Sequence, residues 1–284
     1  MPQAMLNGIR TEYEVRGDGP PLLMFSPGGF DAMMEKWWTL GIYAKTRPLD
    51  WLTRHYSCIL FDRRECGRSG ARIERIGWSD YARQGADLLD HLGIERAHLC
   101  GGCMGVSPVA LFATLHPERV RSMILYWPVG GARYRINGHQ RFAEHLAFVA
   151  AKGLGATVEL VRAGGKSFSG DPRGGPWASA ILNDPAFAGH YGAYDPAAYR
   201  LIVAGMARTL LDRDTAPGAE PEDLLRCAVP ALVIPGADAA HATSAARYLA
   251  ECLPASRYWD AAPEAQTEIA TTDAVLSFLA AHNA

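Results

Sequence analysis

Short apolar runs alternate with amphipathic stretches along the first half of the chain and again along its last quarter. The runs end in glycine, proline or charged residues, which is typical of strands buried in a sheet. The stretches between them have helical spacing; in WSDYARQGADLLDHLGI, Tyr81 and Leu88 can face inward and Ser79 can cap the helix. This alternation predicts a parallel sheet covered by helices on both faces. We expect strands within residues 10–17, 20–30, 56–70, 96–102, 120–131, 227–238 and 256–260, and helices within 78–94, 104–118, 241–254 and 272–282.

The alternation stops between residues 131 and 222. This segment contains stretches that look helical, lacks long β-branched runs, and ends in the proline- and acid-rich sequence DRDTAPGAEPEDL. We interpret it as a helical lid inserted between two strands. The predicted organisation is therefore an α/β core made of residues 1–130 and 223–284, with a lid over 131–222.

The sequence GGCMG, residues 101–105, lies between a predicted strand and a predicted helix. A sharp strand–turn–helix bend needs small residues on both sides of its strained centre, and Gly101 and Gly105 provide them. The bend places Cys103 at a helix N-terminus, where backbone N–H groups and the helix dipole stabilise a thiolate. Cys103 is therefore a candidate nucleophile; the alternative is a buried cysteine in a disused turn.

Four segments, taken in order, resemble motifs of the α/β-hydrolase superfamily: SPGGF at 26–30, DRRECGRS at 62–69, GGCMG, and LVIPGADAAH at 232–241. The resemblance covers nearly the whole chain outside the lid. It implies the α/β-hydrolase fold, with a mostly parallel eight-stranded sheet. It also implies an oxyanion hole made by the N–H of Met104 and an N–H of Gly29 or Phe30. The cysteine at the bend resembles that of dienelactone-hydrolase-type enzymes.

The general base is not at the position where the resembled family has it. The family's histidine follows the last strand, and Ala265 or Gln266 stands near that position here. His241 is the first candidate, since it follows Asp238 by three residues on the loop that normally presents the acid. Asp238 is accordingly the candidate acid. The alternative is that His241 only begins the next helix. A thiol ionises near pH 8.5, so cysteine tolerates a displaced base better than serine does.

Two further residues are candidate bases. Glu65 replaces a glycine of the family pattern; it either pairs with a neighbouring arginine (Arg63, Arg64 or Arg68) or reaches the nucleophile as a proton shuttle. His139 follows a turn-like Asn-Gly in the lid and reaches the site only if the lid closes. Trp127 and Trp177, together with His139, are candidate substrate contacts, because a tryptophan-rich wall favours a small apolar or aromatic substrate.

Composition narrows the function classes. The 284 residues are 49% hydrophobic and carry a formal net charge of −2. The sequence has no excess of basic residues that would indicate nucleic-acid binding, and it has no apolar run of about 18 residues that would indicate a membrane span. Without a signal-peptide pattern, the six cysteines read as free thiols of a cytoplasmic protein. Cys100 and Cys103 form a lone C-x-x-C, read as a buried strand cysteine before the turn cysteine rather than a redox pair. We expect no metal and no cofactor, and a homodimer stays open.

The reading that accounts for most of these features is a hydrolase that attacks a small ester, lactone, thioester or amide through Cys103. An acyl-thioester intermediate would then be hydrolysed by water. Two alternatives stay open. One is a lyase or C–C hydrolase that uses the oxyanion hole and acid/base groups without acylation. The other is a non-catalytic protein that binds a small molecule on the same fold.

Overall fold

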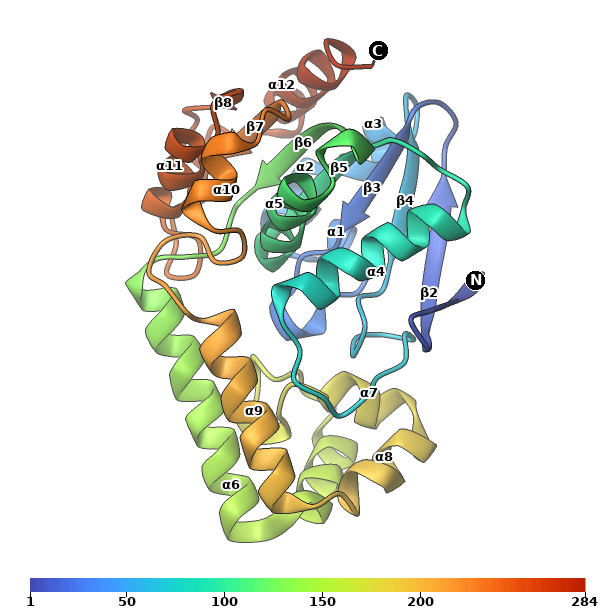
Figure 1. The fold of residues 1–284 in the computed structure, drawn as a ribbon, viewed down its shortest axis with the longest axis vertical. Helices are drawn as coiled ribbons and strands as arrows, with labels where there is room; N and C mark the ends of the chain where they lie inside the picture. The colour runs from blue at the N-terminus through green and yellow to red at the C-terminus, as the bar shows by residue number, and fades with distance from the viewer. Residues whose placement is uncertain (284) are drawn as a thin grey trace.

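The computed structural model describes residues 1–283 and contains one eight-stranded sheet with the strand order β1-β2-β4-β3-β5-β6-β7-β8 (Figure 1). The β1–β2 and β2–β4 pairs are antiparallel and the remaining pairs are parallel. The predicted α/β-hydrolase fold with a mostly parallel eight-stranded sheet is thus confirmed. The strands are β1 (Gln3–Leu6), β2 (Ile9–Arg16), β3 (Pro21–Phe25), β4 (Ser57–Phe61), β5 (Ala97–Gly102), β6 (Val120–Tyr126), β7 (Ala231–Ile234) and β8 (Ser256–Tyr258).

Strand β1 has no counterpart among the individually predicted strands. It joins β2 through the two residues Asn7 and Gly8, whose φ angles of 47° and 71° are those of a tight hairpin turn. The Asn-Gly dipeptide is itself a hairpin signal. The strand escaped prediction because it is only four residues long and its burial alternates, so it forms no continuous apolar run.

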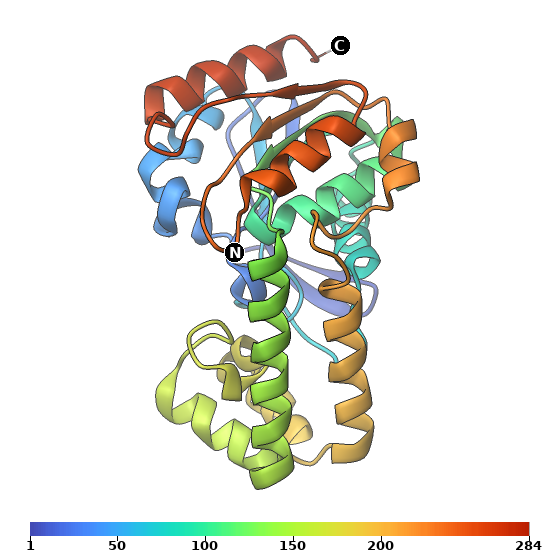
Figure 2. The same ribbon diagram turned by 90° about the vertical axis from the view of Figure 1, so that its left-hand side faces the viewer.

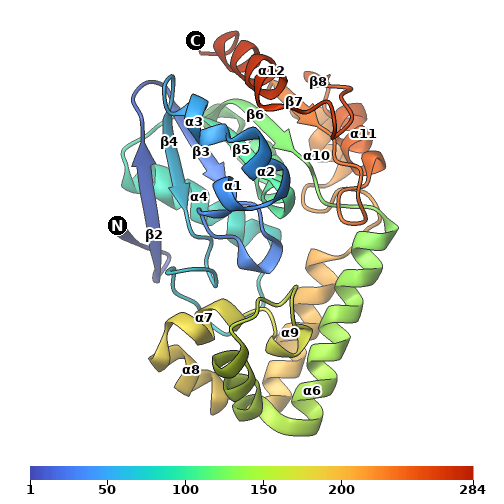
Figure 3. The same cartoon turned by 180° about the vertical axis from the view of Figure 1, so that it is seen from behind.

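Side chains of the central strands alternate between two cores, one on each face of the sheet. Leu23 and Phe25 of β3 pack into one core, and Leu22 and Met24 pack into the other. Figures 1 and 3 view these faces from opposite sides. The first face is covered by α4 (Trp78–His91), α5 (Val106–Leu115), α10 (Pro221–Arg226) and α11 (Thr243–Cys252), and the second by α1 (Lys36–Thr39), α2 (Gly41–Thr46), α3 (Pro48–Leu52) and α12 (Glu268–Ala280).

Helix α4 begins at Trp78, two residues earlier than a Ser79 cap would require. Gly77 precedes the helix, and the Asp80 carboxylate accepts the backbone N–H of Gly77 at 2.8 Å. An aspartate in the first turn also interacts favourably with the helix dipole. Ser79 is therefore not the cap, and Asp80 secures this end of α4.

The segment between β6 and α10 is helical and lies at one end of the sheet (Figure 2). It contains α6 (Ala132–Gly164), which is interrupted at Gly153 where φ is 82°, then α7 (Ala178–Asn183), α8 (Pro185–Gly192) and α9 (Pro196–Leu210). Helices α6 and α9 run side by side and share a core of their own. That core extends to Met104 and to the partly buried side chain of Cys103. We keep the name helical segment for residues 131–222; its role as a lid stays a prediction.

Among residues 1–283, no helix is both long enough and apolar enough to cross a lipid bilayer.

Candidate active site

Cys103 occupies a strained bend at the carboxyl edge of the sheet. Strand β5 ends at Gly102, a single 3-10 turn covers Cys103–Gly105, and α5 begins at Val106. The φ of Cys103 is +54°, in the left-handed region that side chains rarely adopt. A Cβ on Gly101 would lie 2.4 Å from the Gly105 carbonyl oxygen, and one on Gly105 would lie 2.3 Å from that of Phe25. The bend therefore accepts only glycine at these two positions.

The thiol of Cys103 differs electrostatically from the other five thiols. Burial alone would raise its pKa, but the charge of His241 and the backbone N–H groups of Gly28 and Met104 outweigh burial and lower it below its ordinary value. In each of the other cysteines burial raises the pKa, to about 12 in Cys58 and Cys66. Cys103 is thus the thiol that most readily becomes a thiolate.

His241 and Asp238 form a close pair on the loop that follows β7. The Nδ1 of His241 lies 2.8 and 2.9 Å from the two carboxylate oxygens of Asp238, so Nδ1–H donates to the carboxylate. Asp238 also accepts the backbone N–H groups of Ala240 and His241 at 2.8 and 2.9 Å. Hydrogen bonding to His241, first of all, lowers the pKa of Asp238 to about 2. The aspartate is therefore a fixed anion that orients the imidazole.

The other ring nitrogen of His241 faces the protein interior. The side chain is 14% exposed, and its Nε2 is buried with no hydrogen-bond partner of normal geometry among the described residues, the Cys103 sulfur included. Even so, Cys103 and His241 lie close enough that the charge of each shifts the pKa of the other. Burial would lower the pKa of His241, but the Cys103 thiolate and Asp238 raise it to about 10. The two groups favour a thiolate–imidazolium pair.

The backbone around His241 is held by neighbouring strands. Gly130, just after β6, forms a parallel bridge with His241, and its N–H donates to the Ala240 carbonyl at 3.0 Å. The hydroxyl of Thr243 donates to the Gly236 carbonyl at 3.0 Å. Gly236 itself must lack a side chain, because a Cβ there would lie 2.6 Å from the Cβ of His241. His241 is therefore positioned by sheet-like contacts and close packing.

Gln266 occupies the approximate position of the family histidine, and it is fully buried. Its side-chain carbonyl accepts the indole N–H of Trp127 at 2.8 Å, and its amide donates to the carbonyls of Pro235 and Ala261 at 2.7 and 2.9 Å. The Trp127 ring in turn packs 5.4 Å from the ring of His241. Gln266 therefore connects the loops after β6, β7 and β8 by hydrogen bonds, and Trp127 packs against His241. The expected contact of Trp127 with substrate stays a prediction.

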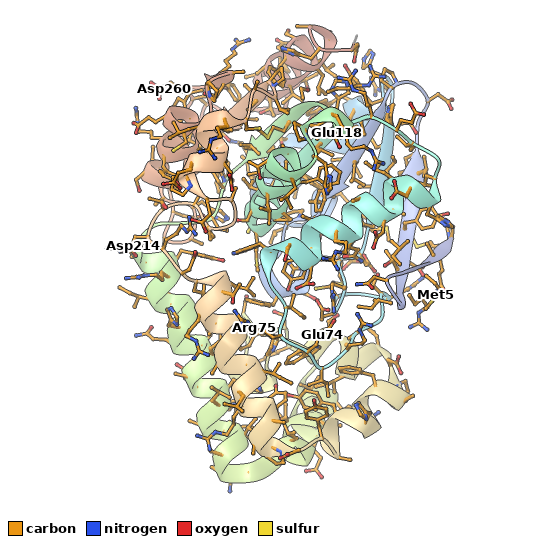
Figure 4. The ribbon with its side chains drawn as sticks, viewed as in Figure 1. Met5, Glu74, Arg75, Glu118, Asp214 and Asp260 are labelled. Atoms are coloured by element: carbon orange, nitrogen blue, oxygen red, sulfur yellow. The ribbon has the colours of Figure 1, made fainter. Side chains whose placement is uncertain are left out.

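Glu65 is engaged by an arginine rather than by the thiol. Its φ is +68°, which explains why the family pattern has glycine at this position. One carboxylate oxygen accepts Nε of Arg64 at 2.6 Å, and the other is buried without a partner. Burial, opposed by Arg64, raises the pKa of Glu65 to about 7. Arg64 also contacts Glu74, which lies on the loop that connects β4 to α4 and is labelled in Figure 4.

Two other expected site residues, His139 and Trp177, lie elsewhere than predicted. His139 is exposed on α6, with Nε2 3.1 Å from the Leu211 carbonyl oxygen, and so is not brought to the thiol. Trp177 is fully buried in the core of the helical segment, where its indole N–H donates to the Arg72 carbonyl at 3.0 Å. The backbone N–H groups that approach the Cys103 sulfur include those of Met104 and Gly28. Gly29 and Phe30 as donors to an oxyanion stay a prediction.

Aromatic rings of the helical segment approach the site from the side opposite the sheet. The Phe30 ring packs edge-on against Phe142 and Phe168, with centroids 5.5 and 5.3 Å away. Phe30 and Cys103 both pack against the core of the helical segment. In the part of the chain that the structure describes, no group of three or more His, Cys, Asp or Glu side chains is arranged to hold a metal ion.

Comparison with known proteins supports the same architecture. Residues 21–139 match the family model described as alpha/beta hydrolase fold. The chain is 33% identical over 125 residues to a putative carbamate hydrolase, RutD, of Azorhizobium caulinodans (44% of this chain, 43% of that protein). It is 34% identical over 127 residues to 2-hydroxy-6-oxo-6-phenylhexa-2,4-dienoate hydrolase of Comamonas testosteroni (44% and 42%). The chain spans less than half the length of these curated relatives.

Among solved structures, the chain resembles the enol-lactonase from Burkholderia xenovorans LB400 with a TM-score of 0.62 and 22% sequence identity. This match covers 98% of this chain and all of the lactonase chain. At such low identity the likeness concerns the fold, which extends over the sheet and the helical segment together.

Proposed function

We propose that this chain of α/β-hydrolase fold is a hydrolase of small esters, lactones, thioesters or amides, with Cys103 as the nucleophile. One observation carries the proposal: the thiol with the lowered pKa lies on a strained bend beside a histidine that is itself oriented by a fixed carboxylate. Nucleophilic catalysis requires this order of groups, from nucleophile to base to orienting residue.

In the first half of the reaction, the Cys103 thiolate attacks the substrate carbonyl carbon and forms a tetrahedral oxyanion. The backbone N–H groups of Met104 and Gly28, which approach the sulfur, are the donors that we assign to that oxyanion. The C–O, C–S or C–N bond to the leaving group then breaks as Nε2–H of His241 protonates the leaving atom. The products of this half are an acyl-thioester on Cys103 and a neutral His241.

In the second half, neutral His241 removes a proton from a water molecule that attacks the thioester carbonyl carbon. The second tetrahedral oxyanion collapses, the carbon–sulfur bond breaks, and the carboxylic acid product leaves. Asp238 keeps the imidazole in the tautomer that exposes Nε2 throughout, because its carboxylate holds the proton on Nδ1. The phenylalanine rings around Phe30 favour a substrate with an apolar or aromatic part.

The test is covalent trapping. The intact protein is mixed with a panel of activated esters, lactones and thioesters, quenched with acid, and measured by intact mass and peptide mapping. We expect an acyl adduct confined to Cys103. The matched control is Cys252→Ala, since Cys252 is likewise partly exposed but lies on α11 with a raised pKa. Adducts that persist in Cys103→Ala, or that depend on Cys252, would contradict the proposal.

A second candidate is a lyase or C–C hydrolase that uses the oxyanion donors and the acid/base groups without acylating Cys103. The match to a relative named 2-hydroxy-6-oxo-6-phenylhexa-2,4-dienoate hydrolase favours keeping it. His241 and Asp238 would then act on the substrate or on water directly, and Cys103 would only line the site. Turnover without an adduct, retained in Cys103→Ala, would support this candidate. Ligand binding without turnover would instead indicate the non-catalytic binding protein.

A further inference from the structure

Arg63 is a buried cation beside the proposed active site. It is 4% exposed and belongs to the loop after β4. Its Nη2 donates to the Gly29 carbonyl at 2.7 Å, and Gly29 directly follows Gly28, whose N–H approaches the Cys103 sulfur. The guanidinium also stacks 4.1 Å from the Tyr81 ring centroid and lies 6.0 Å from that of Phe30. These contacts hold the cation next to the oxyanion loop.

Two donor nitrogens of the Arg63 guanidinium lack a hydrogen-bond partner in the part of the chain that the structure describes. Nε and Nη1 of Arg63 are buried and have no hydrogen-bond partner among the described residues. Glu65 lies near enough for its charge to raise the pKa of Arg63, but among the described residues no carboxylate forms an ion pair with the Arg63 guanidinium, and Glu65 is hydrogen-bonded to Arg64 instead. A buried charge with unpaired donors is costly, and such groups normally have a hydrogen-bonding counterion. Among the described residues, Nε and Nη1 of Arg63 therefore have no hydrogen-bonded anion.

The Arg63 guanidinium lies near residues that also surround Cys103. The phenol of Tyr134, on α6, is affected both by the charge of Cys103 and by that of Arg63. Phe30 contacts the same aromatic core as Cys103 and lies beside the Arg63 guanidinium. Arg63 and Cys103 therefore border the same aromatic core, on which Phe30 packs between them.

We propose that Arg63 is a specificity-determining residue that binds a carboxylate of the substrate through its free Nε and Nη1 donors. The inference rests on the proposed function and narrows it: the ester, lactone, thioester or amide carries a free carboxylate in addition to the reacting carbonyl. A guanidinium offers two parallel N–H donors that match the two oxygens of a carboxylate.

The test uses pairs of alkylating agents that differ only in charge. Iodoacetate, 3-iodopropionate and 4-iodobutanoate are each compared with the corresponding neutral amide, and the rate of Cys103 alkylation is followed by mass. In every case the thiolate displaces iodide, so the acid-to-amide rate ratio cancels the nucleophile's own reactivity. The three chain lengths cover different separations between the sulfur and the guanidinium.

For at least one length, we expect Arg63→Met to lower the acid-to-amide ratio by about 10- to 100-fold, the range for a hydrogen bond to a charged group. Arg63→Lys, which keeps the charge but loses the fork, should fall between Arg63→Met and the unaltered chain. Arg135→Met is the matched control, because Arg135 lies on α6 and pairs with Asp214 at 2.8 Å, and its ratio should not change. Ratios unaffected by Arg63→Met at every length would overturn the inference.

A measurement on the unaltered chain covers the case in which the variants fail to fold. Benzoate should protect Cys103 against iodoacetamide more strongly than benzamide does; equal protection, or none, would again overturn the inference.

The readouts also separate the two proposals. If Cys103 is acylated but the acid-to-amide ratios do not depend on Arg63, the proposed hydrolase function stands and the carboxylate site is wrong. If the ratios depend on Arg63 but no ester acylates Cys103, the carboxylate site stands and the proposed hydrolase function is wrong.

Discussion

The loops after β7 and after β8 meet at the carboxyl edge of the sheet, but they contain different kinds of groups. The loop after β7 carries a charged pair, Asp238 and His241, whose pKa values are shifted in opposite directions. The loop after β8 ends in neutral Gln266, whose hydrogen bonds all go to other parts of the chain. The first loop carries the groups that we propose to transfer protons, and the second holds its neighbours in place by hydrogen bonds.

In this chain the imidazole of His241 lies near the Cys103 sulfur on the loop after β7. The family that the sequence resembles has its histidine on the loop after the last strand, which is β8 here. The β7 loop normally offers only the acid in the family that the sequence resembles, and here it offers both groups within four residues. The position after β8 then becomes free for a structural amide. The comparison is useful because each loop can be altered separately, with a different expected outcome.

The largest effect should come from the loss of the Cys103 thiol. We expect Cys103→Ala to lower kcat/KM by about 10⁴-fold or more, as for the loss of other catalytic nucleophiles. Steady-state kinetics on the best substrate of the trapping panel measures this, with Cys252→Ala as the control. Retained activity would show that neither loop serves a sulfur nucleophile.

The next largest effect should separate the two loops. His241→Ala should cost about 10²- to 10⁴-fold in kcat/KM because it removes the general base. The double variant His241→Ala, Gln266→His should not recover this loss, since a histidine at 266 cannot reproduce the amide's three hydrogen bonds. His139→Ala is the matched control, because that histidine is exposed on α6. Recovery in the double variant would show that the β8 loop still suits a catalytic histidine.

The third effect concerns pH. The kcat/KM profile should rise as Cys103 ionises, below the ordinary pKa of a thiol, and fall as His241 loses its proton near the pKa of about 10. Asp238→Asn removes the anion that supports the imidazolium, so the alkaline limb should move to lower pH and the acid limb to higher pH. At neutral pH we expect a loss of about 10- to 100-fold, the value of a hydrogen bond to a charged group. An unchanged profile in Asp238→Asn would contradict the proposed pairing.

The smallest effect on catalysis should come from the β8 loop. Gln266→Met keeps the size of the side chain but leaves Trp127 and two carbonyls without partners. We expect a loss of about 2–4 kcal/mol in the free energy of unfolding, measured by urea denaturation. Alkylation of Cys103 should change less than it does in His241→Ala. If alkylation falls as far as in His241→Ala while stability is kept, the division of roles between the loops is wrong.

Most of the fold can be predicted from the sequence because buried parallel strands read as apolar runs and the bend at Cys103 has a glycine pattern of its own. Cys103 can be selected because it directly follows such a run, and Asp238 and His241 because they lie on the loop after another. The roles of Gln266 and Trp127 cannot, since their hydrogen bond joins positions 139 residues apart. The approach of the Gly28 N–H to the sulfur depends on the direction of that one bond, and the burial of Trp177 depends on which face of the helical segment packs inward. Neither follows from spacing.

The close contact between Gly236 and His241 also has a use outside this molecule. Because a Cβ at position 236 would lie 2.6 Å from the Cβ of His241, a chain that carries a histidine at 241 in this geometry needs glycine at 236. The resulting signature, Gly-x-Asp-x-x-His directly after an apolar strand, can be searched for in uncharacterised sequences of this fold. Chains that carry it, and that lack a histidine after the last strand, would form a recognisable subgroup with the base on the neighbouring strand.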